Sequence, residues 1–162
     1  VFEDGGQLPG EGLHLVGGER EPGQLGHVGD VVELDLPMAP RLVEAHPRID
    51  PTRGSVAIER GPLVYCLESP DQTPGVDVED VQICTAPGPS ARWEGGRLGG
   101  VVVVEAQGCT TDSTGWGCAL YRPLGSVAPP PGSPTRLMAI PYYAWANRGL
   151  SAMRVWIPRH SG

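Results

Sequence analysis

Strand-like runs between Gly29 and Glu68 constrain the fold of this chain more than any other feature. The stretch contains four short runs that proline and glycine separate. Alternation of apolar and polar residues places the apolar side chains on one face of an extended strand. Proline cannot donate to a central ladder and therefore ends such runs. The four expected strands are Val31–Leu36, Arg41–His46, Ser55–Arg60 and Leu63–Leu67, of which the last is apolar on both faces and so predicted to be central.

The second half of the chain continues the same pattern. A run of four valines has high strand propensity and predicts the interior of a sheet. Near the end, Met153, Val155 and Ile157 alternate and are expected on one face of a returning strand. No segment shows a sustained 3.6-residue period, so we expect an all-β fold built as antiparallel β-sandwich domains. The further strand candidates are Val81–Cys84, Gly99–Glu105, Cys118–Arg122, Thr135–Tyr143 and Ser151–Pro158.

Charge and hydropathy exclude two classes of partner. The formal net charge is −7, and all twelve basic residues are arginines that form no basic run. Nucleic acid is therefore not an expected partner, because phosphate binding needs clustered cations. No apolar run reaches the length of a membrane span, so no membrane partner is expected. The first residues also lack the basic and apolar regions of a signal peptide. The start of a fragment does not reveal the compartment of its parent, so the localisation stays unknown, with the cytoplasm favoured over secretion.

The cysteines and histidines do not form a recognisable metal or nucleophile motif. No C-x-x-C occurs, and the gaps between cysteines match no zinc spacing. Cys66 lies in an apolar strand and is expected to be a buried, inert thiol. A disulfide between Cys109 and Cys118 would close the loop between them, and this pairing stays open. The residues in question are Cys66, Cys84, Cys109 and Cys118, together with His14, His27, His46 and His160, and we assign none of them to catalysis, a cofactor or a metal.

A few charged residues are candidates for chemistry or for ion pairing. Glu33 and Asp35 are two residues apart on the outward face of a predicted strand, where nothing would raise one pKa for acid catalysis. Arg60 precedes a Gly-Pro turn, and Glu59 or Glu68 is its expected structural partner.

Aromatic residues cluster in the second half and allow two interpretations. Aromatic faces can stack on the C–H surfaces of a sugar, or they can bury large areas in a core or domain interface. We favour core or interface packing over a carbohydrate platform. The residues are Trp93, Trp116, Tyr121, Tyr142, Tyr143, Trp145 and Trp156.

Four sequence blocks resemble one enzyme family. In chain order they are GDVVELDLPM, SVAIERGPLVYCLE, IPYYAWANRG and MRVWIP. Together they are similar to the region downstream of the catalytic barrel in glycoside hydrolase family 127, whose members are β-L-arabinofuranosidase-like. The resemblance covers about Gly29 to Pro158. It implies a zinc-bound cysteine nucleophile and a glutamate acid/base in an upstream helical barrel, and no cysteine of this chain lies in a matching motif.

The resemblance completes the expected organisation. Residues 1–28 form an irregular leader, 29–71 part of the middle β-sandwich domain, and 72–162 a C-terminal β-sandwich domain, with Ser69 to Asp80 as a linker or long loop. The chain would be a non-catalytic portion that supports a catalytic barrel it lacks. It would hold no cofactor, zinc belonging to the barrel. The alternatives are a free-standing carbohydrate-binding module and a non-functional truncated gene product.

Overall fold

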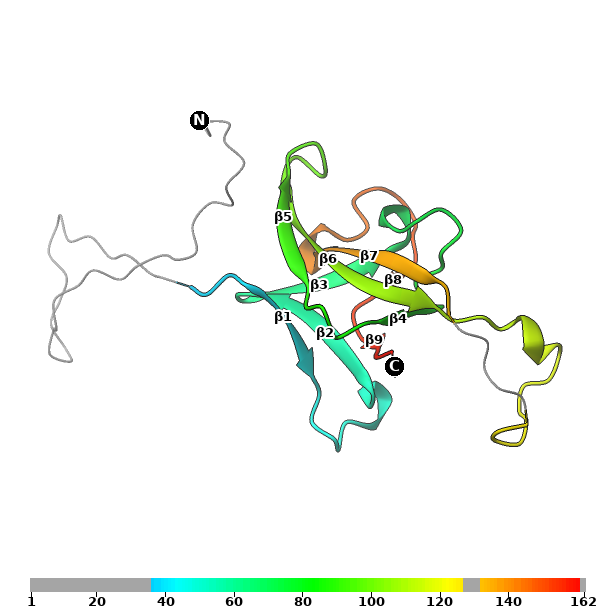
Figure 1. Ribbon diagram of the computed structural model, residues 1–162. Coiled ribbons are helices and arrows are strands. Elements are labelled where there is room, and N and C mark those ends of the chain that lie inside the picture. Colours follow the sequence, from blue (N-terminus) through cyan, green and yellow to red (C-terminus); the bar gives the residue numbers. More distant parts are fainter. Residues whose placement is uncertain (1–35, 127–131, 161–162) are drawn as a thin grey trace, which may run out of the picture.

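The computed structural model describes residues 36–126 and 132–160, which form a curled antiparallel β-sheet (Figure 1). The described ranges contain single turns of 3-10 helix but no α-helix, and the all-β prediction is confirmed. The predicted leader and nearly all of the predicted strand Val31–Leu36 lie outside the described residues. In chain order the elements are β1 (Pro40–Glu44), η1 (Asp50–Thr52), β2 (Ser55–Arg60), β3 (Leu63–Glu68), η2 (Ser69–Asp71), β4 (Val81–Ile83), β5 (Ser90–Glu94), β6 (Val101–Thr110), η3 (Thr114–Trp116), β7 (Pro134–Pro141), η4 (Tyr142–Ala144), β8 (Met153–Arg154) and β9 (Ile157–Pro158).

The first three strands form a meander, as their alternating patterns predict. β1 pairs with β2 along its whole length, and β2 pairs with β3 across a tight turn that joins Arg60 to Leu63. Gly61 has a φ of 57°, and a Cβ there would lie 2.3 Å from the sulfur of Met38, so glycine is required at this turn. β3 continues to a second neighbour, β7, and its Cys66 and Leu67 are buried on opposite faces. The predicted central strand is therefore confirmed.

The ten-residue strand β6 organises the second half. One edge of β6 pairs with β7, and the other edge pairs first with β5 and then with β4. The valine run lies in this strand, with Val103 and Val104 fully buried, as predicted. β5 was not predicted, because its sequence, SARWE, has little apolar alternation. The partner strand β6 holds it in register, from Ser90 opposite Glu105 to Glu94 opposite Val101.

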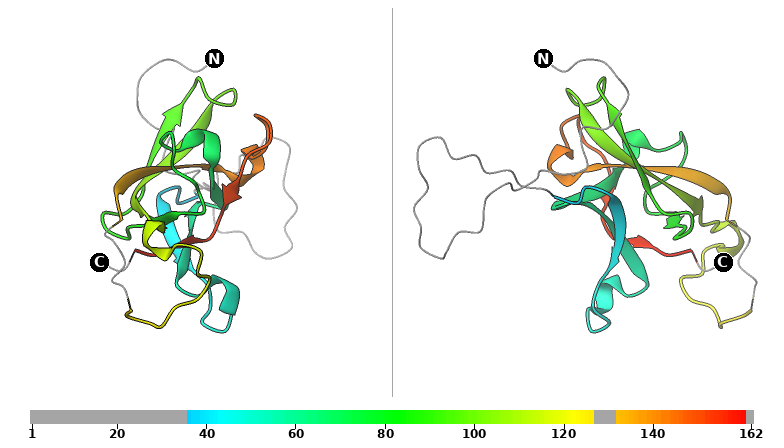
Figure 2. Two further views of the ribbon diagram at one scale, coloured as in Figure 1. Left: turned by 90° about the vertical axis from the view of Figure 1, so that its right-hand side faces the viewer. Right: turned by 60° about the vertical axis from the view of Figure 1, so that its left-hand side comes forward.

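The C-terminal segment closes the sheet. β2 and β3 separate beyond their hairpin, and the segment fills the gap, since β8 pairs with β3 and β9 pairs with β2. Beyond β9, the backbone N–H of His160 donates to the carbonyl oxygen of Ile83 in β4. The sheet thereby curls until its two ends meet through this segment, and β1 and β2 run across β6 and β7 (Figure 2).

Each face of the curled sheet carries a hydrophobic cluster. The inner cluster is the larger and includes Tyr65 and Leu67 of β3 and Leu137 of β7, while the outer cluster includes Cys66 and Ile140. The prediction that Met153, Val155 and Ile157 share one face is wrong. Met153 and Val155 pack on the outer cluster, whereas Ile157 enters the inner one, because the chain bends between β8 and β9.

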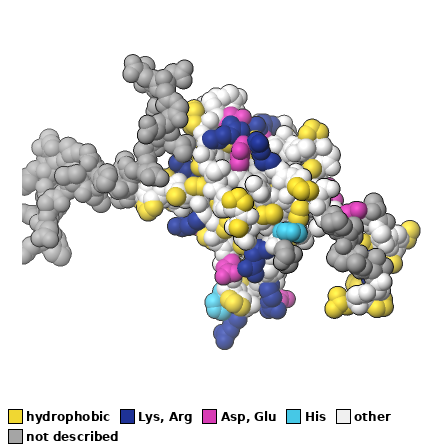
Figure 3. Space-filling model, viewed as in Figure 1, with side chains coloured by type: hydrophobic (Ala, Val, Ile, Leu, Met, Phe, Trp, Pro, Cys, Tyr) yellow, Lys and Arg dark blue, Asp and Glu magenta, His cyan; other side chains and the backbone are white. Residues whose placement is uncertain are grey.

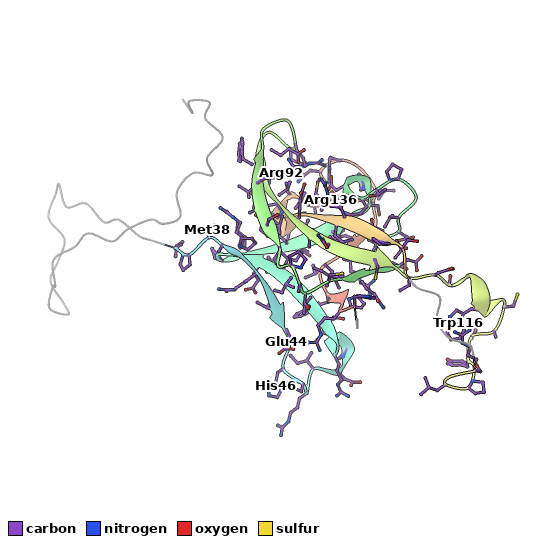
Figure 4. The ribbon with its side chains drawn as sticks, viewed as in Figure 1. Met38, Glu44, His46, Arg92, Trp116 and Arg136 are labelled. Carbon is purple, nitrogen blue, oxygen red and sulfur yellow. The ribbon has the colours of Figure 1, made fainter. Side chains whose placement is uncertain are left out.

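The predicted strand Cys118–Arg122 is also wrong. Residues 111–126 project from the sheet, and Trp116 lies in this arm (Figures 1 and 4). Tyr121 is 91% exposed and Leu124 is fully exposed. The apolar residues of this run have no neighbouring strand to pair with among the described residues, and a short apolar run does not form a strand by itself.

The predicted linker Ser69–Asp80 is a loop that packs on the sheet. It contains no strand, as expected, but Asp71, Gln72 and Val78 are buried. Strands on both sides of Asp71 pair with each other, β3 with β7 and with β8. The division of the chain into two domains at this residue stays a prediction.

Candidate functional site

A buried ionic cluster lies where β3 ends. Glu68 is the last residue of β3 and has no exposed surface, and the carboxylate of Asp71, in the following turn, is also fully buried. The guanidinium of Arg148 contacts both. Its Nη1 and Nη2 lie 2.6 Å from the two carboxylate oxygens of Asp71, and Nη2 also pairs with Glu68. A planar guanidinium fits this bidentate arrangement, which a lysine cannot reproduce.

Further hydrogen bonds tie this cluster to the loop that follows η4. Glu68 accepts hydrogen bonds from the hydroxyl of Ser151 at 2.6 Å and from the backbone N–H of Ala146 at 3.2 Å. Ala146 has a φ of 63°, a left-handed conformation that is uncommon for a residue with a Cβ. The hydrogen bonds to Glu68 therefore hold the loop in a strained conformation at Ala146.

The charges of the cluster stabilise one another. Burial by itself would raise the pKa of Glu68, but the hydrogen bonds from Ser151, Arg148 and Ala146 outweigh it, and the pKa is lowered. The pKa of Arg148 is raised, chiefly by its hydrogen bonds to Asp71. Glu68 and Arg148 are thus charged at neutral pH, and the cluster serves as a structural clamp.

The loop that this ionic cluster holds in place carries three exposed aromatic side chains. Tyr143 is 69% exposed, Tyr142 and Trp145 are also exposed, and the rings of Tyr142 and Trp145 lie 6.0 Å apart between centroids with a tilt of 31°. Leu150, at the end of the loop, is fully exposed. We call residues 142–150 the aromatic loop. Exposed apolar side chains on a rigid loop are typical of a surface that another molecule or domain covers.

The remaining aromatic candidates do not join this surface. Trp93 is exposed on β5, where its ring lies over Gly100. Trp116 and Tyr121 belong to the projecting arm, and the guanidinium carbon of Arg122 lies 3.8 Å from the ring centroid of Trp116. Trp156 is half-buried between β8 and β9. The structure thus brings together Tyr142, Tyr143 and Trp145 of the seven predicted residues.

In the described part of the chain, one histidine contacts a cysteine, but the pKa of that thiol is raised. His46 is exposed, whereas Nδ1 of His160 lies 3.1 Å from the sulfur of the buried Cys109. Burial, followed by the nearby Cys84, raises the pKa of the Cys109 thiol. Burial likewise raises the pKa of Cys66 to about 12, with Glu68 and Asp71 acting in the same direction. Both thiols are protonated at neutral pH and are therefore poor nucleophiles.

The four cysteines are free thiols with very different exposure, and this leads to a measurable prediction. We expect only the exposed Cys118 to react rapidly with a thiol-specific chromogenic reagent, and Cys66 to react only after denaturation. A Cys118→Ser variant should lose the rapid phase and keep the slow one. A thiol count that falls short of four in the denatured, unreduced protein would instead indicate a disulfide.

Neither predicted partner of Arg60 pairs with it. The carboxylate of Glu59 lies 2.9 Å from Arg41 on the outer face, and Glu68 is engaged by Arg148. Glu33 and Asp35 lie outside the described residues. Arg148 was missed at the sequence level, because its partners lie 77 and 80 residues away and only the fold brings them together.

Metal-binding groups and membrane-spanning helices are both absent from the described residues. Nowhere in residues 36–126 and 132–160 do three or more histidine, cysteine or acidic side chains gather in a way that could hold a metal ion. Over the same ranges, no helix is long and apolar enough to cross a membrane.

Fold and site together define an antiparallel β domain that presents a clamped aromatic loop. Comparisons with known proteins then place this domain in a family. The model of the glycoside hydrolase family 127 C-terminal domain matches residues 40–158. This chain therefore belongs to glycoside hydrolase family 127, in its C-terminal domain.

Individual relatives agree with this assignment. A non-reducing end β-L-arabinofuranosidase of Bifidobacterium longum is 34% identical over 135 residues, which cover 80% of this chain and 20% of the relative. The crystal structure of a family 127 β-L-arabinofuranosidase from Geobacillus stearothermophilus superposes with a TM-score of 0.68 at 36% identity, covering 80% of this chain and 19% of that one. This chain thus spans about one fifth of the length of the relatives that it matches.

Proposed function

We propose that this chain is the non-catalytic C-terminal part of a family 127 glycoside hydrolase, and that its aromatic loop packs against the catalytic domain of that enzyme. The observation that carries the proposal is the rigid presentation of exposed rings. Arg148 and Glu68 hold the loop, so it loses little conformational freedom when it binds. Burial of the rings then contributes directly to association.

The size of the surface supports a contact between domains. Each aromatic side chain buries about 150–250 Å² when fully covered. With exposed fractions of 69% for Tyr143, 47% for Tyr142 and 36% for Trp145, the three side chains could together supply about 230–380 Å². This is part of an interface between domains of one chain, which buries about 600–1,500 Å². About four fifths of each relative lies outside the matched segment, and such a partner would lie there.

For the parent enzyme, we propose hydrolysis of non-reducing-end β-L-arabinofuranosides, as the name of the Bifidobacterium relative indicates. The zinc-bound thiolate that the resemblance implies would belong to the catalytic barrel. The described residues of this chain do not fit such a site, because the buried thiols of Cys66 and Cys109 have raised pKa values and no ligand set surrounds them. The role proposed for this chain is accordingly to support the barrel and to form part of the wall of its substrate cleft.

A binding experiment tests the proposed function. The Bifidobacterium relative, truncated before its matched C-terminal segment, is immobilised and titrated with this chain. We expect saturable binding that weakens at least tenfold when Tyr143 and Trp145 are both replaced by alanine, because the rings lose their buried area. Tyr121→Ala, which removes an even more exposed aromatic on the projecting arm, serves as the control and should bind like the wild type. This chain alone should not cleave an aryl β-L-arabinofuranoside, with or without added zinc.

A carbohydrate-binding module would behave differently in a second titration. With arabinose oligosaccharides and tryptophan fluorescence as the readout, we expect no saturable change. A saturable change that Trp145→Ala abolishes and Trp116→Ala preserves would support the binding module and reject the interface.

A further inference from the structure

Arg60 is a buried cation without an anionic partner among the described residues. Only 8% of the residue is exposed, its Nε atom has no hydrogen-bond partner, and none of the ion pairs of the described residues includes it. An uncompensated charge in such a position is costly, because burial removes its hydration. The residue therefore needs an explanation that the described part of this domain does not supply.

The neighbours of Arg60 are apolar or neutral. In the sheet register, Arg60 lies opposite Pro40 on one side and Leu63 on the other, and directly paired residues share a face. Tyr65 is its diagonal neighbour on that face, and the phenol of Tyr65 donates to the carbonyl oxygen of Val102 at 3.1 Å. A phenol is neutral at physiological pH, because burial raises the pKa of Tyr65, while the nearby Arg60 opposes this shift. It cannot neutralise the guanidinium.

The other buried or half-buried arginines of the described chain all have partners. Arg97 and Arg148 bind carboxylates, and Arg154 donates to the backbone carbonyl oxygens of Val78, Glu79 and Trp156. Arg122 lies over the ring of Trp116. Arg60 shares a side-chain hydrogen bond with the neutral phenol of Tyr65. It differs from Arg97 and Arg148 because no carboxylate of the described residues pairs with it.

That position borders the aromatic loop. Tyr65 pairs with Pro141, which immediately precedes η4, and Tyr143 is close enough to raise the pKa of Tyr65. The polypeptide that precedes β1 reaches the sheet at the same place. Pro40 lies opposite Arg60, and the Met38 side chain covers the Gly61 turn at the end of the sheet where the described chain begins (Figure 4). Any upstream domain is therefore connected to this end of the sheet.

Exposed hydrophobic side chains and arginines also adjoin one another on the surface at large, as the yellow and dark blue atoms of Figure 3 show. Most of these arginines are solvated, as Arg41 is. Arg60 is the buried exception, and arginine is among the residues that most often dominate the energy of protein interfaces.

From this geometry we infer that Arg60 is the ionic anchor of the domain interface: it receives a carboxylate from the upstream catalytic domain, beside the aromatic loop. This inference rests on the proposed function and makes it specific, since it names the residue and the chemistry of the partner group. A guanidinium that is already desolvated forms a stronger pair with an incoming carboxylate than a solvated one does.

The first test uses the full-length chain alone and compares Arg60→Met with Arg41→Met in urea unfolding. Methionine keeps the aliphatic volume and removes the charge. Because the charge has no anionic partner among the described residues, we expect the unfolding midpoint of Arg60→Met to equal or exceed that of the wild type. Arg41→Met removes a solvated pair and should shift the midpoint only slightly. A clear fall in the midpoint for Arg60→Met would mean that Arg60 has a partner within this chain and would overturn the inference.

The second test uses the binding experiment with the truncated Bifidobacterium relative. We expect Arg60→Met to weaken binding at least tenfold, whereas Arg41→Met leaves it unchanged. If the aromatic double variant loses binding but Arg60→Met does not, the proposed function stands and the anchor is rejected. If the wild type does not bind at all, the proposed function fails, and the anchor fails with it.

A third measurement tests whether Arg60 binds a small free anion instead of a carboxylate of another domain. The isolated chain is titrated with sodium acetate against sodium chloride at equal ionic strength, and the thermal midpoint is recorded. We expect the wild type and Arg60→Met to respond alike. A saturable rise with acetate that only the wild type shows would identify a small-anion site and overturn the interface.

Discussion

A chain that ends at Ser151, and therefore lacks β8 and β9, is expected to lose cooperative folding. The missing segment joins three parts of the sheet: β8 bonds to β3, β9 bonds to β2, and His160 bonds to β4. Without it, buried edges of β2 and β3 keep unpaired backbone groups, each costing about 1–3 kcal/mol. Loss of the buried Ile157 adds about 2–5 kcal/mol, judged from substitutions of such residues by alanine.

Together these losses approach the whole stability of a domain of this kind, about 5–15 kcal/mol. Circular dichroism during urea unfolding measures the effect, and we expect the truncated chain to show no sigmoidal transition. A chain that ends at His160 retains the segment and is the control. A truncated chain with the same midpoint and slope as the control would show that the closure does not stabilise the sheet.

Arg148→Met is expected to lower the free energy of unfolding by about 3–5 kcal/mol, the usual cost of removing one partner from a buried ion pair. The substitution leaves the carboxylate of Glu68 buried without a cation and leaves Asp71 with Arg97 alone. Arg148→Lys should recover only part of the loss, because an ammonium cannot make the bidentate contact. Arg53→Met, which removes the exposed pair with Asp50, should change the free energy by less than about 1 kcal/mol and is the control.

The same cluster predicts a pH dependence. Because the folded-state pKa of Glu68 is lowered, its carboxylate contributes stability that is fully present above its unfolded pKa of about 4.3. That contribution is lost as the pH falls through the folded pKa. Urea midpoints measured downward from pH 6 should therefore fall more steeply for the wild type than for Glu68→Gln, which has no proton to gain at this position. Parallel curves for the two proteins would contradict the assignment.

Strand identity was the most predictable property of this chain. β1, β2, β3, β4 and β7 follow directly from alternating or fully apolar runs between proline and glycine, since burial of one or both faces imposes that pattern. β5 was not predictable, because its partner β6 rather than its own composition holds it in the sheet. Cys118–Arg122 has an apolar pattern but no strand beside it, so the pattern failed there.

The candidate site, too, could be predicted from the sequence only in part. The aromatic residues at 142, 143 and 145 were visible in the sequence, where core or interface packing was favoured over a carbohydrate platform, but only the structure shows that their side chains are exposed. The clamp beneath them was not visible, because an ion pair between Arg148 and Glu68 depends on two chain segments meeting in space.

The amino-acid sequence, read alone, determined that the chain forms antiparallel strands, because local alternation and turn residues act over a few positions. Tertiary structure alone decided how the sheet closes, which face Ile157 enters and which charges are paired. Arg60 shows the difference most clearly. Two acids, Glu59 and Glu68, lie near it in the sequence. Strand alternation places Glu59 on the opposite face, where it pairs with Arg41, and the carboxylate of Glu68 pairs with Arg148. Burial and pairing depend on contacts between distant segments, and such contacts exist only once the sheet has curled.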